Sequence, residues 1–303
     1  MAGGAGFRGA VMEIESVAIL GPGLLGGSLA LDLSGRGGIG VRLWGRRQAA
    51  LDQARAMGFD GHCTTDLAEA AAGAALVVLA TPVGVMHDLA VRIAALADPP
   101  QLVTDMGSVK GMVEDEVAPV LTAAGIPFVG SHPMCGSERA GMEAAQRGLF
   151  AGAACVVVAG TDSSPAHVQA IESFWTALGG RVVRMDARSH DEAVARVSHL
   201  PHALAALLAG VATRDDPSVL ELAARGFRDS TRVALGPPEM WCEILLENRE
   251  AMLRALKAYA GGLEALGQAL AANDAPAIRA MLEAGREARS RLAPDNQTRS
   301  PNP

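Results

Sequence analysis

Two patterns of apolar residues divide the chain at about residue 186. Before that point, short apolar runs alternate with stretches whose apolar residues recur every three or four positions, which predicts parallel strands joined by crossover helices. Beyond it the β-branched runs stop, while the helical spacing continues to about residue 292. We therefore predict an α/β domain with a mostly parallel sheet over 14–186, followed by an all-α domain over 187–292.

The individual elements follow from these runs and from the proline, glycine and asparagine residues between them. The first 13 residues and the polar tail 293–303 carry neither pattern, so we expect both to be disordered. Strands are predicted at 17–20, 41–44, 76–79, 102–105, 127–130, 155–158 and 182–185. Helices are predicted at about 48–57, 84–96, 109–124 and after Pro165, and then at 190–213, 218–226, 238–272 and 275–291.

The first strand runs into a glycine-rich turn, VAILGPGLLGGSLA, that opens a helix. Its first glycine permits the tight turn, the second lets the backbone approach a pyrophosphate, and the third lets the helix pack on the strand. The unpaired N–H groups of the helix and the positive end of its dipole then face the phosphates. This pattern is typical of a Rossmann domain that binds a dinucleotide. The predicted contacts are Gly21, Gly23, Leu24, Leu25 and Gly26.

The end of the second strand bears on which dinucleotide is bound. An acidic residue there would bind the ribose 2′-hydroxyl of NAD, but the chain has Gly45, Arg46 and Arg47. Guanidinium groups suit a phosphate because they present a fork of donors to its oxygens. We therefore expect NADP, with NAD possible; the alternative is that both arginines are solvated residues at a helix start. Thr81 and Pro82, after the third strand, complete the expected cofactor contacts.

Charge and composition narrow the classes of partner. The net charge of the 303 residues is −7 and the basic residues are scattered, which argues against nucleic acid or an anionic membrane. No run reaches the roughly 18 continuous apolar residues that span a bilayer, and the N-terminus lacks the apolar stretch of a signal peptide. The four cysteines show no CxxC pairing, so we expect buried thiols, with neither a disulfide nor zinc. A cytoplasmic protein with a small-molecule ligand is predicted.

A candidate for acid–base chemistry follows the strand predicted at 127–130. His132 would lie at the ligand-binding edge of the sheet, and Ser108, after a neighbouring strand, could hydrogen-bond one of its ring nitrogens. Imidazole titrates near neutrality, and a hydroxyl group whose carbon loses hydride must also lose its proton. We expect a general base with a pKa of about 6 to 7 if burial shifts it little. The alternative is a loop histidine that caps backbone groups.

The helical half adds three features. His199 and His202 share a helical face, but no carboxylate or thiol repeats at compatible spacing, so no metal site is predicted. Arg232 lies in a junction between helices, where it could clamp a carboxylate or bind helix carbonyls. The predicted helix 238–272 carries a leucine-rich stripe that needs a partner surface. We expect a homodimer, the alternative being intramolecular packing.

Seven segments follow one another along the chain in the order GPGLLGGS, TPV, TDMGSVK, GSHPMCGSERAG, SHDEAVARVSHLPHA, GFRDSTRVA and MWCEILLENRE. Taken together, they resemble the prephenate and arogenate dehydrogenase family of tyrosine biosynthesis. The resemblance implies a Rossmann domain followed by a helical dimerisation domain, and oxidative decarboxylation of prephenate or arogenate to 4-hydroxyphenylpyruvate or tyrosine. The family often has an acid after the second strand, from which this chain departs.

By motif position, the resemblance also implies roles for single residues. His132 matches the histidine that accepts the substrate hydroxyl proton, Ser108 the serine that orients it, and Arg232 the arginine that binds a substrate carboxylate. Two other functions stay open: a Rossmann reductase of the 3-hydroxyacid class, which usually relies on a lysine, and a non-catalytic NADP-binding sensor. The residues that match the lining of the substrate pocket are Ser137, Glu138, His202 and Trp241.

Overall fold

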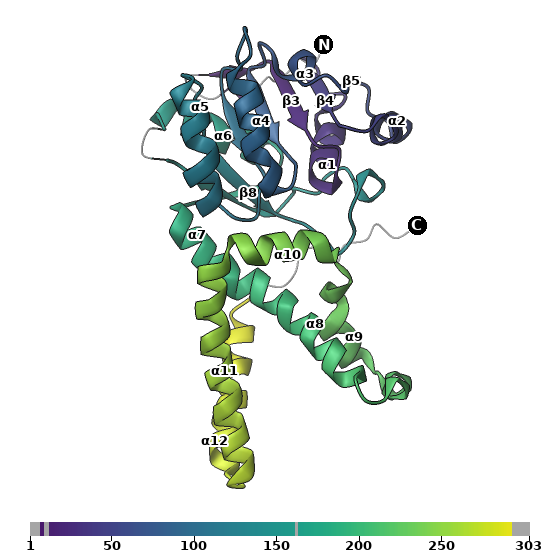
Figure 1. Ribbon diagram of the computed structural model, residues 1–303, viewed down its shortest axis with the longest axis vertical. Coiled ribbons are helices and arrows are strands. Elements are labelled where there is room, and N and C mark those ends of the chain that lie inside the picture. The colour runs from purple at the N-terminus through teal and green to yellow at the C-terminus, as the bar shows by residue number, and fades with distance from the viewer. Residues whose placement is uncertain (1–6, 9–11, 161–162, 293–303) are drawn as a thin grey trace. The chain divides into compact units, whose positions relative to one another are not determined.

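The computed structural model describes residues 7–8, 12–160 and 163–292 (Figure 1). The chain forms two compact units, Met1–Arg249 and Glu250–Pro303. Most of the two ends predicted to be disordered lies outside the described residues. Within the first of them, however, β1 (Phe7–Arg8) pairs antiparallel with β2 (Glu13–Ile14).

A five-stranded parallel sheet lies at the centre of the first unit. Its order is β5-β4-β3-β6-β7, so the chain steps outward from the central β3 in both directions. This order confirms the predicted Rossmann-type α/β fold with a mostly parallel sheet. The strands are β3 (Ser16–Leu20), β4 (Gly40–Trp44), β5 (His62–Thr64), β6 (Leu76–Leu79) and β7 (Val103–Asp105).

Both faces of this sheet are covered. On β3, Val17 and Ile19 pack into one apolar cluster and Ala18 and Leu20 into another, because successive side chains of a strand point to opposite faces. A strand buried on both faces is apolar throughout, which is why the sequence shows a continuous run there. Helices α1 (Leu24–Leu33), α2 (Gln48–Ala56) and α6 (Pro165–Ala177) contribute to the first cluster, and α3 (Leu67–Ala71), α4 (Met86–Ala94) and α5 (Ala118–Ala123) to the second.

Three further strands form a second sheet in the order β10-β9-β8. β8 (Gly130–Met134) runs antiparallel to β9 (Ala154–Val158), and β9 runs parallel to β10 (Arg181–Met185). The strand predicted at 127–130 is therefore displaced: Phe128 makes only an isolated parallel bridge, and the strand proper begins at Gly130. As a result His132 lies within an antiparallel strand, opposite Val156, and not beyond the end of a parallel one.

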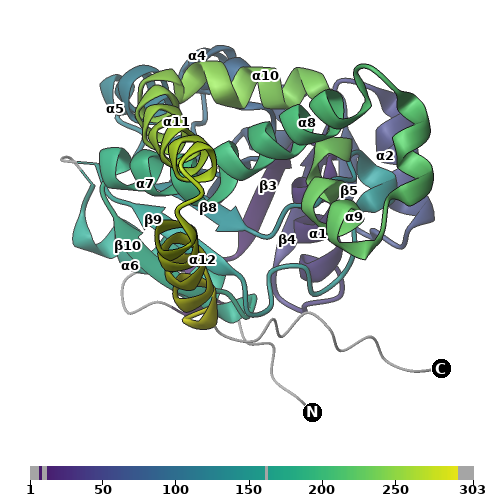
Figure 2. The ribbon, with the colours of Figure 1, turned by 90° about the horizontal axis from the view of Figure 1, so that it is seen from below.

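The helices that follow lie across the ends of the strands (Figure 2). α7 (Ala187–Val194) continues through a π-helical turn, Ala195–His199, into α8 (Leu200–Thr213). The wide turn ends just before Pro201, which has no N–H group to donate into the preceding turn. Three short helices follow α8, and α10 (Pro238–Glu247) comes after them. The short helices are Pro217–Leu222, α9 (Arg225–Thr231) and Arg232–Leu235.

The helix predicted over 238–272 is broken at Asn248, which corrects the prediction of one continuous helix. The side-chain amide of Asn248 donates to the carbonyl of Asp191 (2.9 Å), and α10 ends there. The second unit consists of the greater part of α11 (Arg249–Ala271) together with α12 (Ala275–Ser290). In the turn between these two helices, Asp274 caps α12 by accepting from the N–H of Ala277 (3.0 Å).

Among the described helices, only the run Ala187–Thr213 is long and apolar enough to cross a membrane. One such helix is weak evidence for a membrane span, and this one contains four buried polar residues of the candidate active site.

All four cysteines are free, but Cys242 is exposed and so contradicts the expectation of buried thiols. Burial raises the pKa of Cys135 and Cys155 to about 12, so these two thiols stay protonated.

Candidate active site

The glycine turn after β3 has the geometry of an anion site. Gly23 precedes the first residue of α1, no side chain caps this helix, and a Cβ at Gly23 would meet nothing within 4 Å. Gly21 has a φ of +123°, and a Cβ there would lie 2.6 Å from the carbonyl oxygen of Ala80. A Cβ at Gly26 would strike the carbonyl of Gly21. The open helix start therefore fits the pyrophosphate of a dinucleotide.

The predicted cofactor segment Thr81–Pro82 lies beside this turn. A Cβ at Gly21 would also lie 3.1 Å from the Thr81 methyl group, and the buried Thr81 hydroxyl has no hydrogen-bond partner among the described residues. Pro82 caps a short 3₁₀ turn that follows. An unpartnered buried hydroxyl beside an open helix start is suited to a polar ligand, because leaving it unpaired costs free energy.

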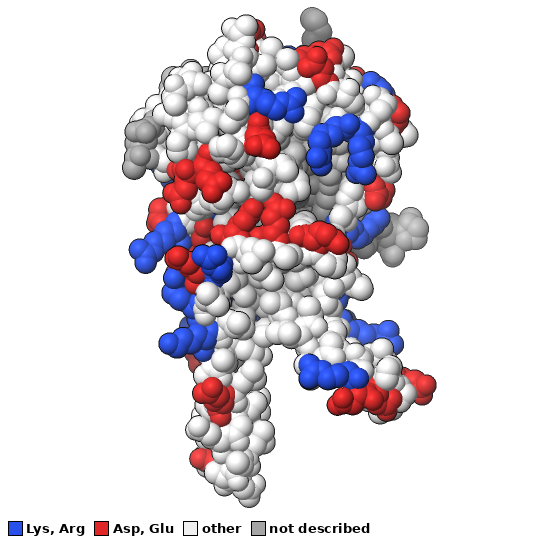
Figure 3. All heavy atoms as spheres, viewed as in Figure 1, with Lys and Arg blue, Asp and Glu red and all other residues white. Residues whose placement is uncertain are grey.

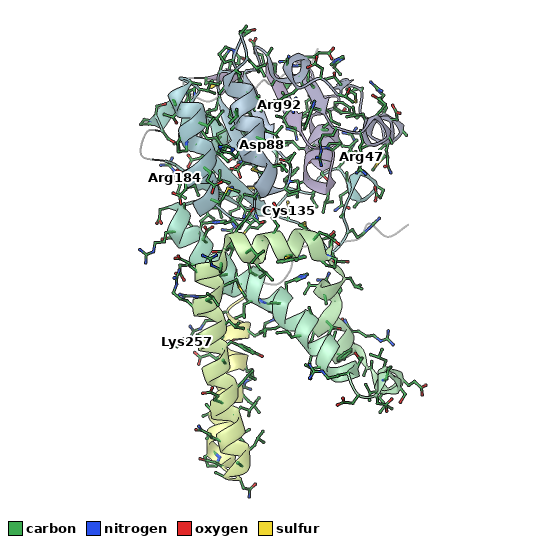
Figure 4. The ribbon with its side chains drawn as sticks, in the orientation of Figure 1. Arg47, Asp88, Arg92, Cys135, Arg184 and Lys257 are labelled. Atoms are coloured by element: carbon green, nitrogen blue, oxygen red, sulfur yellow. The ribbon has the colours of Figure 1, made fainter. Side chains whose placement is uncertain are left out.

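The two arginines lie near the same turn. The N–H of Gly21 donates to the carbonyl of Trp44 (3.0 Å), and a Cβ at Gly45 would lie 2.7 Å from Pro22, so the end of β4 is close to the glycine turn. Arg46 and Arg47 follow directly and are exposed; Figure 4 labels Arg47. Their guanidinium groups are accessible to a ligand at this edge of the sheet.

A chain of hydrogen bonds begins at His132. Its Nδ1 is 2.8 Å from Nε2 of His190, and Nδ1 of His190 is 2.8 Å from Oδ1 of Asp191. The Asp191 carboxylate also accepts from the backbone N–H groups of Lys110 and Gly111, both at 2.8 Å. All three side chains are buried. His190 and Asp191 belong to the segment SHDEAVARVSHLPHA, but the sequence does not indicate that they line up behind His132.

Electrostatics keep the His132 ring neutral. Burial, the ring of His190, the cationic Lys110 and then His199 all lower the pKa of His132 well below its ordinary value of 6.5. The expectation of a pKa near 6 to 7 is therefore wrong, because burial penalises the charged ring. Burial acts to raise the pKa of Asp191, but the hydrogen bonds from His190 and from the two backbone N–H groups outweigh it and lower the pKa. Asp191 is thus ionised at neutral pH.

A fully buried ion pair supports the segment beneath His132. The Lys110 ammonium contacts Asp105, and neither side chain is exposed to solvent. The Asp105 carboxylate also accepts from the N–H groups of Gly107 (2.8 Å) and Ser131 (2.9 Å). It therefore joins the loop after β7 to the strand that carries His132. The sequence does not single out this pair, because an isolated lysine next to a strand is more commonly a surface residue.

Ser108 lies in the same loop, but its predicted contact with His132 is not formed. Nδ1 of His132 is engaged by His190, and the Ser108 hydroxyl makes no hydrogen bond within the described part of the chain. Its role as an orienting residue stays a prediction.

The predicted substrate residues form two pairs. Arg232 donates to Glu138 at 2.5 Å, so its partner is a carboxylate and not the carbonyl groups at a helix end. The rings of His202 and Trp241 are stacked, with centroids 3.5 Å apart and an angle of 12° between their planes. Ser137 instead accepts from the N–H of Arg139 (3.1 Å) and so stabilises its own turn.

His199 lies behind the stacked pair. Its Nδ1 is 3.2 Å from the side-chain nitrogen of Asn248, and its ring meets Trp241 edge-on. Burial lowers the pKa of His199 to about 4 and also lowers that of His202, so both rings are neutral. In the described ranges, no group of three His, Cys, Asp or Glu side chains is arranged to hold a metal ion.

Acidic side chains gather along α10 (Figure 3). Glu243 accepts from the N–H of Gly84 at 2.7 Å and so links α10 to the loop that follows Thr81 and Pro82. Burial, and then the neighbouring Glu243 and Glu116, raise the pKa of Glu247 to about 7. This helix thus bonds to the loop after β6 through Glu243 and also carries Trp241.

Two protein-family models match this chain. Residues 29–184 match the model described as prephenate dehydrogenase, nucleotide-binding domain, and residues 186–284 match prephenate dehydrogenase, dimerization domain. The chain belongs to the prephenate dehydrogenase family. The family resemblance drawn from the seven segments is therefore confirmed, and the two models meet where the apolar pattern changes.

Relatives within the prephenate dehydrogenase family cover almost the whole chain. The cyclohexadienyl dehydrogenase of Zymomonas mobilis is 31% identical over 290 residues, which are 94% of this chain and 98% of that protein. The prephenate dehydrogenase of A. aeolicus, solved with hydroxyphenyl propionate and NAD+, is 27% identical with a TM-score of 0.81, covering 91% of this chain and 98% of that one. The arogenate dehydrogenase of Synechocystis is 27% identical with a TM-score of 0.75, covering 91% and 99%.

Proposed function

We propose that this protein oxidises and decarboxylates prephenate or arogenate, with transfer of hydride to a nicotinamide dinucleotide, in the biosynthesis of tyrosine. The observation that carries the proposal is the buried His132 ring, neutral at physiological pH and hydrogen-bonded through Nδ1 alone among the described residues. Its Nε2 is the nitrogen available to accept a proton from a substrate hydroxyl group.

The chain's own residues divide the work of this reaction. His132 takes the proton of the ring hydroxyl, Arg232 binds a substrate carboxylate, and the stacked rings of His202 and Trp241 form an apolar wall beside it. When bound, the nicotinamide supplies the hydride acceptor. The ring carboxylate opposite the hydroxyl leaves as carbon dioxide, the electrons of the broken C–C bond aromatise the ring, and the resulting phenolate oxygen takes the proton back from His132. Aromatisation of the ring drives the reaction. Neither a metal nor a covalent nucleophile is required.

Arg232 is paired with Glu138 in the structure, and this pairing has a consequence for binding. A substrate carboxylate would compete with Glu138 for the same guanidinium donors. Because the Arg232 side chain is 57% exposed, part of its fork stays accessible while the pair is intact. We infer that Glu138 holds Arg232 in position before the substrate arrives.

We propose NADP as the preferred cofactor and NAD as the alternative. The support is the pair of exposed arginines at the end of β4, where no acid is present to bind a ribose hydroxyl. Each charge-assisted hydrogen bond to a phosphate contributes about 1.5 to 3 kcal/mol, so replacing both arginines with Ala should weaken NADP far more than NAD. Arg55→Ala, an exposed change on the helix α2 that follows the two arginines, is the control. Equal losses for both cofactors would refute the assignment.

A direct assay tests the reaction. The formation of NADPH and of NADH is measured with prephenate and with arogenate in turn, using His132→Asn as the control. Turnover with one of the two substrates, and a loss of about 10² to 10⁴-fold in the variant, is expected. Cofactor binding without turnover on either substrate would instead indicate a sensor. The 3-hydroxyacid alternative is not favoured, since 3-hydroxyisobutyrate dehydrogenases of solved structure, at 16% and 19% identity, share the fold alone.

We also propose a homodimer, built on the helical part that matches the dimerization model. In the single chain, Leu253, Leu256 and Leu263 of α11 are 60%, 39% and 54% exposed, so the stripe expected from the sequence has no full cover. Ile244, an apolar residue of the predicted helix 238–272, is buried within its own chain and does not belong to this exposed stripe. A second copy of the chain would cover the remaining leucines.

A further inference from the structure

The hydrogen-bond chain behind His132 has a defined direction. Its far end is the Asp191 carboxylate, which is ionised and can only accept hydrogen bonds. The hydrogen between Asp191 and His190 must therefore be carried by Nδ1 of His190. Two backbone N–H groups, those of Lys110 and Gly111, fix the carboxylate from the other side, so the direction cannot be reversed by a rotation of Asp191.

The direction passes through His190 to the catalytic ring. When His190 carries hydrogen on Nδ1 alone, its bare Nε2 accepts. Its partner 2.8 Å away is Nδ1 of His132, which must then donate. A neutral His132 that carries hydrogen on Nδ1 has a bare Nε2. This is the nitrogen that faces away from the chain of hydrogen bonds.

We propose that His190, held by Asp191, is a positioning residue that keeps His132 in the tautomer with hydrogen on Nδ1 and a lone pair on Nε2. The inference rests on the proposed function, because it assigns the residues that prepare the base of that reaction. The opposite tautomer would present an N–H group to the substrate hydroxyl and could not take its proton. In a serine-protease triad, a change that imposes the wrong tautomer costs about 10⁴-fold in kcat.

The arrangement also serves the charged state of the base. When Nε2 takes the substrate proton, His132 becomes an imidazolium ion in a buried site, which is costly without a partner. Its Nδ1–H still donates to His190, and His190 still donates to the Asp191 carboxylate. The negative charge thus stabilises the imidazolium through one intervening ring, without contact between Asp191 and the substrate.

Two substitutions at position 190 test the role. His190→Leu removes the acceptor for Nδ1 of His132, and kcat should fall about 10² to 10⁴-fold with unchanged cofactor affinity. In His190→Gln the side-chain oxygen can still accept at that position, so this variant should retain most of the activity. Equal activity of the two variants would overturn the proposal, as would a wild-type kcat in His190→Leu. Thermal unfolding of both shows whether the leucine variant is folded.

A second measurement does not depend on turnover or on the variants. Long-range ¹H–¹⁵N NMR of the ¹⁵N-histidine-labelled protein distinguishes protonated from bare ring nitrogens, with His132→Asn used for assignment. In the full chain, His132 should show a protonated Nδ1 and a bare Nε2. A protonated Nε2 would refute the inference even in an active enzyme. If the wild type turned over neither substrate but showed the expected tautomer, the proposed function alone would fail.

Discussion

Replacing Lys110 by methionine tests the buried support of the site. The chain has only two lysines, and one of them is fully buried against Asp105, which is also fully buried. Methionine keeps the length and the apolar stem of the side chain but removes its charge. The carboxylate of Asp105 would be left with the N–H groups of Gly107 and Ser131 as its only described partners.

The cost can be worked from this geometry. Removing one partner of a buried pair costs about 3 to 5 kcal/mol, because the other charge stays buried and uncompensated. At roughly 2 to 4 °C per kcal/mol for a chain of this size, the Tm should fall by about 6 to 20 °C. Adding Asp105→Asn removes the stranded charge. The double variant should therefore be more stable than the sum of the two single changes predicts, by about 0.5 to 3 kcal/mol.

The same substitution should alter catalysis in a way that destabilisation alone does not. Lys110 is one of the groups that lower the pKa of His132, so its removal raises that pKa. As the proposed base, His132 can accept a proton only when neutral, and the acid limb of kcat/KM should therefore move to higher pH.

The assay compares thermal unfolding and the pH dependence of kcat/KM in the wild type, Lys110→Met and Lys257→Met. The other lysine, Lys257, is exposed on α11 and serves as the matched control (Figure 4). Equal Tm values for the two variants, or an acid limb that stays in place in Lys110→Met, would refute the reasoning.

Three further predictions concern binding, pH and assembly. Arg232→Ala should raise KM strongly with little change in Tm, since its partner Glu138 is a partly exposed carboxylate; a large drop in Tm with unchanged KM would contradict this. Glu247 has a pKa of about 7 against an ordinary 4.5, so it weakens the fold as pH rises from about 4.5 to 7. Glu247→Gln should therefore raise the Tm at pH 8 more than at pH 5, and an equal change would count against it. Leu256→Glu should shift the expected dimer toward monomer in sedimentation, a result absent if α11 is not the interface.

Much of the fold was open to prediction because it depends on neighbours in sequence. The alternation of apolar runs and the glycine turn require only the periods of strand and helix and the backbone freedom of glycine. The apolar runs predict the parallel sheet, and the glycine turn predicts the open start of α1. The structure contains both. The boundaries were less accurate where long-range contacts intervene: Asn248 ends a helix because its side chain bonds to a residue 57 positions away.

The contacts and electrostatics of the candidate site depend on tertiary structure more than the fold does. The sequence by itself selected His132, Arg232 and the glycine turn, because motif order and residue chemistry suffice to name them. It could not supply their partners, since His190 is 58 residues from His132 and Glu138 is 94 residues from Arg232. Nor could it supply the lowered pKa of His132, because that shift comes mainly from burial, which is a property of the packed chain. Only the fold brings a buried carboxylate, two imidazole rings and a buried lysine together, and so decides which nitrogen of His132 is free to accept a proton.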